Sequence, residues 1–165
     1  MDIKPENILL GGDFQLKICD FDGAFQQGDA ETLGRGTPNY RAPEIIYLRK
    51  VQDPYKTDIY SAGIVLFTLL FGHLPCVESE ECVGKDMFKL MHSKDTSQFW
   101  ALHQDLHPEL QISQDFKDLF EKMVCFNPEK RATIQEIKES KWSKGEEMGH
   151  VELKRALLTT AKPLN

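Results

Sequence analysis

The stretch MDIKPENILL at residues 1–10 is the most informative part of the sequence. Its residues Asp2, Lys4 and Asn7 form a compact polar array around Pro5. A residue before a proline favours extended backbone, and side chains two apart in extended chain face the same way, so Asp2 and Lys4 should converge. A carboxylate can accept a proton from a hydroxyl, an ammonium group can neutralise a phosphoryl oxygen, and an Asn carbonyl can ligate magnesium. The array predicts a phosphate and metal site; a charged, capped tail is the alternative.

A β-hairpin is predicted directly after this array. Ile8-Leu9-Leu10 is a short apolar strand candidate, and Gly11-Gly12-Asp13 is a strong turn signal. The following residues 14–18 alternate between apolar and polar side chains, as a half-buried strand does.

A long irregular segment follows the hairpin. It opens with Asp20-Phe21-Asp22-Gly23 and closes with GTPNYRAPE at residues 36–44. Residues 20–44 have no clean period and are rich in glycine and proline. Long segments of this kind in compact domains tend to be functional or mobile.

The strongest helix signal is the apolar run Ile59–Phe71, with Thr57 as the predicted N-cap and Gly72 as the end. Because the run is apolar on nearly all sides, it predicts the central buried helix. Its 13 residues fall short of the roughly 20 that span a bilayer. Further helices are predicted near 85–92, 114–126, 133–141 and 147–159.

Composition limits the class of protein. The chain has 165 residues, enough for one domain with a sizeable core, and 41% of them are hydrophobic. The formal net charge of -6 argues against a nucleic-acid-binding protein. No membrane segment is expected, and the polar start is unlike a signal peptide.

The four cysteines form no C-x-x-C pair, which favours reduced thiols in the cytoplasm or nucleus. Zinc binding by His73, Cys76 and Cys82 is a weaker alternative, because the spacing is irregular.

Three segments resemble motifs of eukaryotic protein kinases, and they occur in the same order as in that family. The segment 1–7 resembles the catalytic loop H-R-D-x-x-x-x-N, with Met1 at the position of its Arg. Residues 20–22 resemble the D-F-G motif, and residues 36–44 resemble the G-T-x-x-Y-x-A-P-E segment that closes the activation loop.

The resemblance implies a fold and a division of the chain. Lys4 with Thr37 resembles the Ser/Thr type of kinase. The implied fold is mainly α, a protein-kinase-like C-terminal lobe in which a helical bundle carries a small β-hairpin beside the catalytic loop. A partial kinase domain is expected over 1–142 and a helical extension over 143–165.

The resemblance also implies a role for each site residue in ATP-dependent phosphorylation of Ser/Thr residues on proteins. Asp2 would be the catalytic base and Lys4 would contact the γ-phosphate of ATP. Asn7 and Asp20 would hold Mg²⁺, and Thr37 would bridge Asp2 and Lys4.

Two further positions match structural features of the family. Asp58 corresponds to an Asp that ties the catalytic loop to the central helix. Arg131 corresponds to the Arg that pairs with the Glu of A-P-E, here Glu44. Both are expected to have structural roles.

One departure from the family pattern and one candidate regulatory position also follow from the resemblance. Asp22 occupies the usual Gly position of D-F-G, which should affect loop switching more than metal binding, with Gly23 able to absorb part of the turn. Thr32 is the best activation-loop phosphorylation candidate, although the Arg that would receive its phosphate has no counterpart here.

Residues 1–165 contain no Gly-rich loop and no V-A-I-K strand, so the N-terminal lobe of the family has no counterpart in them. Three hypotheses follow: an active kinase, a catalytically inactive kinase-derived binding module, and an incomplete gene model of a longer kinase. Part of the apolar helix is expected to be exposed, available to a partner or to the missing lobe.

Overall fold

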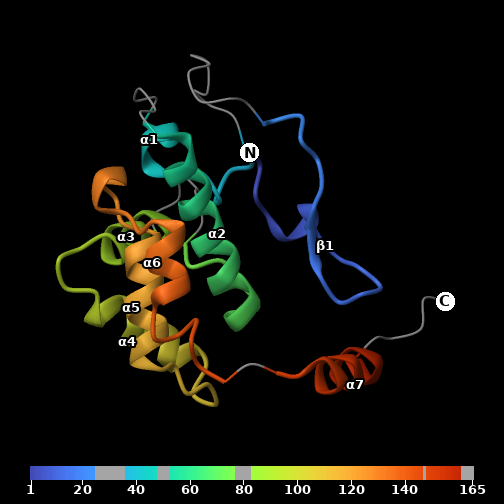
Figure 1. Ribbon diagram of the computed structural model, residues 1–165. Coiled ribbons are helices and arrows are strands. Elements are labelled where there is room, and N and C mark those ends of the chain that lie inside the picture. Colours follow the sequence, from blue (N-terminus) through green and yellow to red (C-terminus); the bar gives the residue numbers. More distant parts are fainter. Residues whose placement is uncertain (25–35, 48–52, 77–82, 147, 161–165) are drawn as a thin grey trace.

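The structure is a computed structural model that describes residues 1–24, 36–47, 53–76, 83–146 and 148–160. Within these ranges the chain is mainly helical, with one two-stranded sheet. Helices α1 to α6 form a bundle, and the hairpin stands to one side of it with α7 nearby (Figure 1). The expected mainly α fold with a small hairpin is confirmed.

The predicted hairpin is present directly after the polar array. A 3-10 turn at Pro5–Asn7 leads into β1 (Ile8–Leu10), which pairs antiparallel with β2 (Leu16–Ile18). The second strand begins two residues later than predicted. Phe14 has a φ of 59°, a left-handed conformation that a strand cannot contain.

The central helix is α2, which spans Pro54–Phe71. Gly72 ends it with a φ of 73°, as predicted. The predicted cap at Thr57 is wrong. The helix begins earlier because Asp53 accepts a hydrogen bond from the Tyr55 amide at 2.9 Å and Pro54 suits the first turn.

The core forms where α2 meets α5 (Gln114–Met123). Gly63 allows the close approach, because a Cβ there would lie 2.9 Å from Val124 Cγ1 and 3.0 Å from Met123 Cβ. The Ser113 side chain caps α5 by accepting from the Phe116 amide. The buried aromatic core combines side chains of α2, α4 and α5: Tyr60, Phe67, Phe71, Phe99, Trp100, Phe116 and Phe120.

The other helices are short. The predicted ones are α3 (Val83–Met91), α6 (Ile134–Glu139) and α7 (His150–Thr160), each differing from its predicted bounds by a few residues. Two helices, α1 (Pro43–Ile46) and α4 (Ser97–Leu106), and the 3-10 turn Pro128–Lys130 were not predicted. No helix among the described residues is long and apolar enough to cross a membrane.

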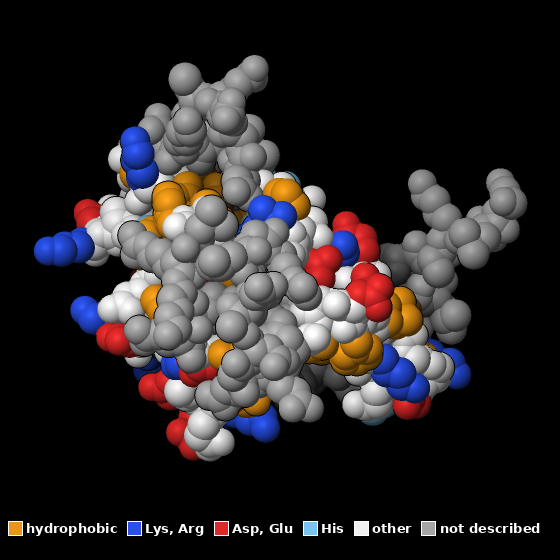
Figure 2. Space-filling model, turned by 90° about the horizontal axis from the view of Figure 1, so that it is seen from above, with side chains coloured by type: hydrophobic (Ala, Val, Ile, Leu, Met, Phe, Trp, Pro, Cys, Tyr) orange, Lys and Arg blue, Asp and Glu red, His pale blue; other side chains and the backbone are white. Residues whose placement is uncertain are grey.

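Apolar side chains of α2 reach the surface, as expected. Leu69 is 71% exposed, and Leu70 beside it is also exposed. On the hairpin, Leu9 and Leu16 are exposed as well. Figure 2 shows, on the face seen from above, hydrophobic side chains that reach the surface in separate patches.

Candidate active site

Asp2, Lys4 and Thr37 meet in a closed triangle of polar contacts. The Lys4 Nζ lies 2.8 Å from Asp2 Oδ2 and donates to Thr37 Oγ1 at 2.9 Å. The Thr37 hydroxyl donates to Asp2 Oδ2 at 2.9 Å, and the Thr37 amide donates to Asp2 Oδ1 at 2.7 Å. Two segments far apart in sequence therefore fix one carboxylate, and Thr37 bridges Asp2 and Lys4 as the resemblance implied.

The local backbone explains why Asp2 and Lys4 converge. Lys4 is extended, with φ -155° and ψ 161°, and it precedes Pro5. The chain then turns tightly, and the Asn7 amide donates to the Lys4 carbonyl at 3.0 Å. The predicted extended geometry is confirmed.

Electrostatics keep both partners of this ion pair charged at neutral pH. Partial burial raises the pKa of Asp2, but hydrogen bonds from Lys4 and Thr37 outweigh it, and the net pKa lies below its ordinary value. The hydrogen bond to Asp2 raises the pKa of Lys4. Asp2 is therefore an ionised carboxylate that can accept a proton.

Asn7 brings Asp20 next to this triangle. The buried Asn7 side chain donates from Nδ2 to the Asp2 carbonyl at 2.9 Å and to Asp20 Oδ2 at 3.5 Å. The Cys19 amide donates to the Asn7 carbonyl at 2.9 Å, which ties the end of the hairpin to its start. The Asn7 side-chain amide and the Asp20 carboxylate thus lie together, and the oxygen atoms of such groups are hard ligands that Mg²⁺ prefers. The donor set fits the metal.

The residues after Asp20 depart from the expected pattern. Asp20 itself has a φ of 61°, whereas Asp22, at the position where the family usually has Gly, is not among the residues with positive φ. Phe21 is 61% exposed. The backbone of Asp22 therefore does not have a conformation that requires glycine. Thr32, the phosphorylation candidate, lies outside the described residues.

A buried ion pair supports the segment that carries Thr37. Arg131 is 1% exposed and Glu44 6%. Arg131 donates to both Glu44 carboxylate oxygens, at 2.8 and 2.9 Å. Burial opposes the ionisation of Glu44, but these hydrogen bonds and the charge of Arg131 lower its pKa. The predicted pair is confirmed.

Asp58 joins the start of the chain to the central helix. Its Oδ1 accepts from the Met1 amino group at 2.8 Å. The expected link between this helix and the catalytic-type loop is therefore present.

Sequence reasoning missed two residues that shape the segment 36–44. The Arg41 side chain donates from Nε to the Gly36 carbonyl at 2.7 Å. The Ser61 hydroxyl donates to the Tyr40 carbonyl at 2.8 Å. Thr57, one helical turn before Ser61, also contacts this segment by donating to Glu44 at 3.0 Å. The spacing of these two hydroxyl residues on one face of the helix was the signal in the sequence.

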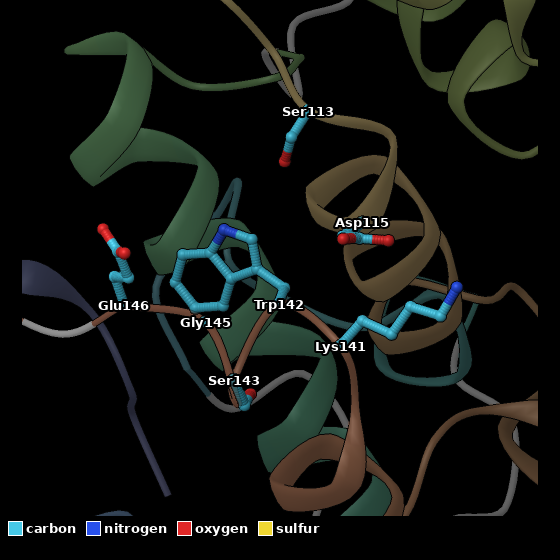
Figure 3. Close-up of a pocket in the computed structure, with 7 residues that line it drawn as sticks. All are labelled: Ser113, Asp115, Lys141, Trp142, Ser143, Gly145 and Glu146. Atoms are coloured by element: carbon cyan, nitrogen blue, oxygen red, sulfur yellow. The ribbon is translucent and has the colours of Figure 1, made fainter.

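An open pocket lies apart from this site, where the start of α5 faces the chain after α6 (Figure 3). The Trp142 ring there packs edge-on against Phe116, with ring centroids 5.9 Å apart. Lys141 and Glu146 add opposite charges to its lining. None of its lining residues is a predicted site residue.

Comparison with known proteins shows the family to which the chain belongs. The family model described as "Protein kinase domain" matches residues 1–143. A protein named CBL-interacting serine/threonine-protein kinase 10, from Arabidopsis thaliana, is 39% identical over 152 residues. A probable serine/threonine-protein kinase, KCC4 of Saccharomyces cerevisiae, is 35% identical over 138 residues. CBL-interacting protein kinase 4 of Oryza sativa subsp. japonica is 33% identical over 142 residues.

These relatives are much longer proteins. The matches cover 86%, 82% and 82% of this chain, in the order given above, but 28%, 12% and 28% of the relatives. The family model covers the region that contains the site.

Proposed function

The chain belongs to the eukaryotic Ser/Thr protein kinase family, and on that premise we propose that its site transfers the γ-phosphoryl group of ATP to Ser/Thr hydroxyls of protein substrates. The observation that carries the proposal is the triangle of Asp2, Lys4 and Thr37. It places an ionised carboxylate within contact distance of an ammonium group, and a hydroxyl bonded to both fixes their positions.

In the proposed reaction, Asp2 accepts the proton of the substrate hydroxyl while the hydroxyl oxygen bonds to the γ-phosphorus and ADP leaves. Lys4 lies against the γ-phosphate and balances its charge. Thr37 holds the Asp2 carboxylate in place through its amide and its hydroxyl. Protein kinases generally use Mg²⁺, which neutralises phosphate charge when bound, and Asn7 and Asp20 would hold it.

A catalytically inactive binding module is the second candidate. Phe21, the residue after Asp20, is 61% exposed, and this apolar area beside the site favours a partner there.

The direct test is phosphate transfer from labelled ATP with Mg²⁺ to a Ser/Thr peptide by the purified 165-residue chain. Asp2→Asn keeps the size of the side chain and removes the base, so transfer should fall about 100-fold or more. The matched control is Asp13→Asn in the exposed hairpin turn, which should leave the rate unchanged. A wild-type rate no higher than that of Asp2→Asn would reject the catalytic proposal and favour the binding module.

We also propose an intracellular location, in the cytoplasm or nucleus. Its support is that Cys19 and Cys125 form no disulfide in the described part of the chain. Microscopy of the tagged protein tests it, and a secreted product would contradict it.

A further inference from the structure

Three histidines meet on the bundle, away from the candidate active site. His73 follows α2, His103 lies on α4, and His107 lies at the end of α4. The His73 ring lies nearly parallel to both others, with centroid distances of 5.0 Å to His107 and 5.4 Å to His103. Phe71 packs against the same group of rings.

His73 and His107 form the middle of a linear chain of polar contacts. At one end, His73 Nδ1 lies 2.9 Å from the Leu74 carbonyl. In the centre, the two Nε2 atoms lie 2.9 Å apart. At the other end, His107 Nδ1 lies 3.2 Å from Glu109 Oε1.

Counting protons shows that two neutral rings cannot make all three bonds. The Leu74 carbonyl and the Glu109 carboxylate only accept, so each Nδ1 must carry a hydrogen. The central contact needs one more hydrogen, on one of the two Nε2 atoms. Three hydrogens are therefore required, whereas two neutral imidazoles carry two. With four, both central nitrogens would be donors and the bond between them would break.

We propose that His73 and His107 share one extra proton and act as a pH-sensitive clasp between the segment after α2 and the segment after α4. The neutral pair takes up one proton from solvent, and the resulting cation lies against the Glu109 carboxylate. This inference does not depend on the proposed function.

The groups that face the clasp support a single positive charge on it. Glu109, 68% exposed, has its pKa lowered by its own backbone amide and by the hydrogen bond and charge of His107. His103 is 2% exposed, and both its ring nitrogens lack a hydrogen-bond partner among the described residues. Burial, followed by the charge of His73, lowers the pKa of His103 to about 4, against the opposing influence of the Pro75 carbonyl. His103 is thus neutral and adds no second charge.

The clasp has a clear pH dependence. An unfolded chain loses its histidine protons near pH 6.5. Because closing the proposed clasp takes up one proton, closing it becomes less favourable as the pH rises above that value. The clasp should hold the two segments under mildly acidic conditions and release them under alkaline ones.

The test counts imidazole protons in the intact 165-residue chain by long-range ¹H–¹⁵N spectra between pH 5 and 8, with EDTA present to exclude metal ions. At pH 6 we expect three protonated nitrogens in total for His73 and His107, lost together as one proton on raising the pH. Two protonated nitrogens at pH 6, or two rings that titrate independently, would overturn the proposal.

A matched pair of variants provides a second measurement. In His107→Gln, the side-chain amide can donate to the unprotonated Nε2 of a neutral His73, so the bridge no longer needs the extra proton. The control is His150→Gln, an exposed histidine on α7. When the pH is raised from 6 to 8, the melting temperatures of the wild type and the control should fall by about 2–4 °C more than that of His107→Gln. Equal pH profiles for all three chains would contradict the clasp.

Discussion

Two ion pairs in this molecule use the same chemistry in different surroundings. Arg131–Glu44 is buried, with two hydrogen bonds between its charged groups. Asp2–Lys4 is partly open to solvent, with each side chain about one fifth exposed. Buried charges without partners are very costly, whereas partly exposed ones can be rehydrated. The comparison teaches that the first pair holds the structure together, whereas the second remains accessible from solvent.

The largest effect should come from breaking the buried pair. Arg131→Met leaves Glu44 buried without a cationic partner and removes the bond to the Lys56 carbonyl. We expect the free energy of unfolding to fall by about 3–5 kcal/mol. Urea unfolding followed by circular dichroism measures it. A second variant that also carries Glu44→Leu should recover part of the loss, and a loss below 1 kcal/mol for the single variant would contradict the distinction drawn here.

His103, a buried side chain whose ring nitrogens have no hydrogen-bond partner among the described residues, adds a third case to the comparison. His103 contacts Phe67 and Phe99 edge-on, so His103→Phe should fit the same aromatic cluster. The folded pKa of about 4 lies below the unfolded value near 6.5. The unfolded state therefore binds more protons between these values, and stability falls as pH falls. From pH 7 to pH 5, the wild type should lose about 2 kcal/mol through this residue.

The measurement compares urea unfolding of the wild type and His103→Phe at pH 7 and pH 5. The variant should lose less stability over this range than the wild type does. Identical losses would show that His103 is hydrated or protonated in the folded chain.

The smallest effect on stability should come from the partly exposed pair. Lys4→Met removes the ammonium group but leaves Asp2 bonded to Thr37. We expect the free energy of unfolding to fall by no more than about 1 kcal/mol, with less difference from wild type at high salt. Phosphate transfer, if the proposed function is correct, should fall far more than stability does. A stability loss as large as that of Arg131→Met would remove the contrast between the two pairs.

Much of the fold could be predicted because its signals are local. The apolar run of α2, the glycine at its end and the turn of the hairpin each depend on a few neighbouring residues. The start of α2 was misplaced because Asp53 and Pro54 compete with Thr57 for the same role. Helix α4 was missed because its buried face, Phe99, Trp100 and His103, is defined by partners on other helices.

The residues of the candidate site could also be chosen from the sequence, and the convergence of Asp2 with Lys4 follows from the backbone preference before Pro5. Their partners come from farther away. The Ser61 bond to the Tyr40 carbonyl and the Arg41 bond to Gly36 depend on how the segment 36–44 folds over α2. No local pattern encodes such contacts.

The sequence by itself determined the family of this protein and its set of chemical groups, because short motifs with fixed spacing specify both. Only the tertiary structure decided how those groups are charged and paired. Burial makes Arg131 and Glu44 a structural pair and keeps His103 neutral. Folding also brings the Nε2 atoms of His73 and His107 to within 2.9 Å of each other. Hydration and distance set protonation, and both are properties of the folded chain.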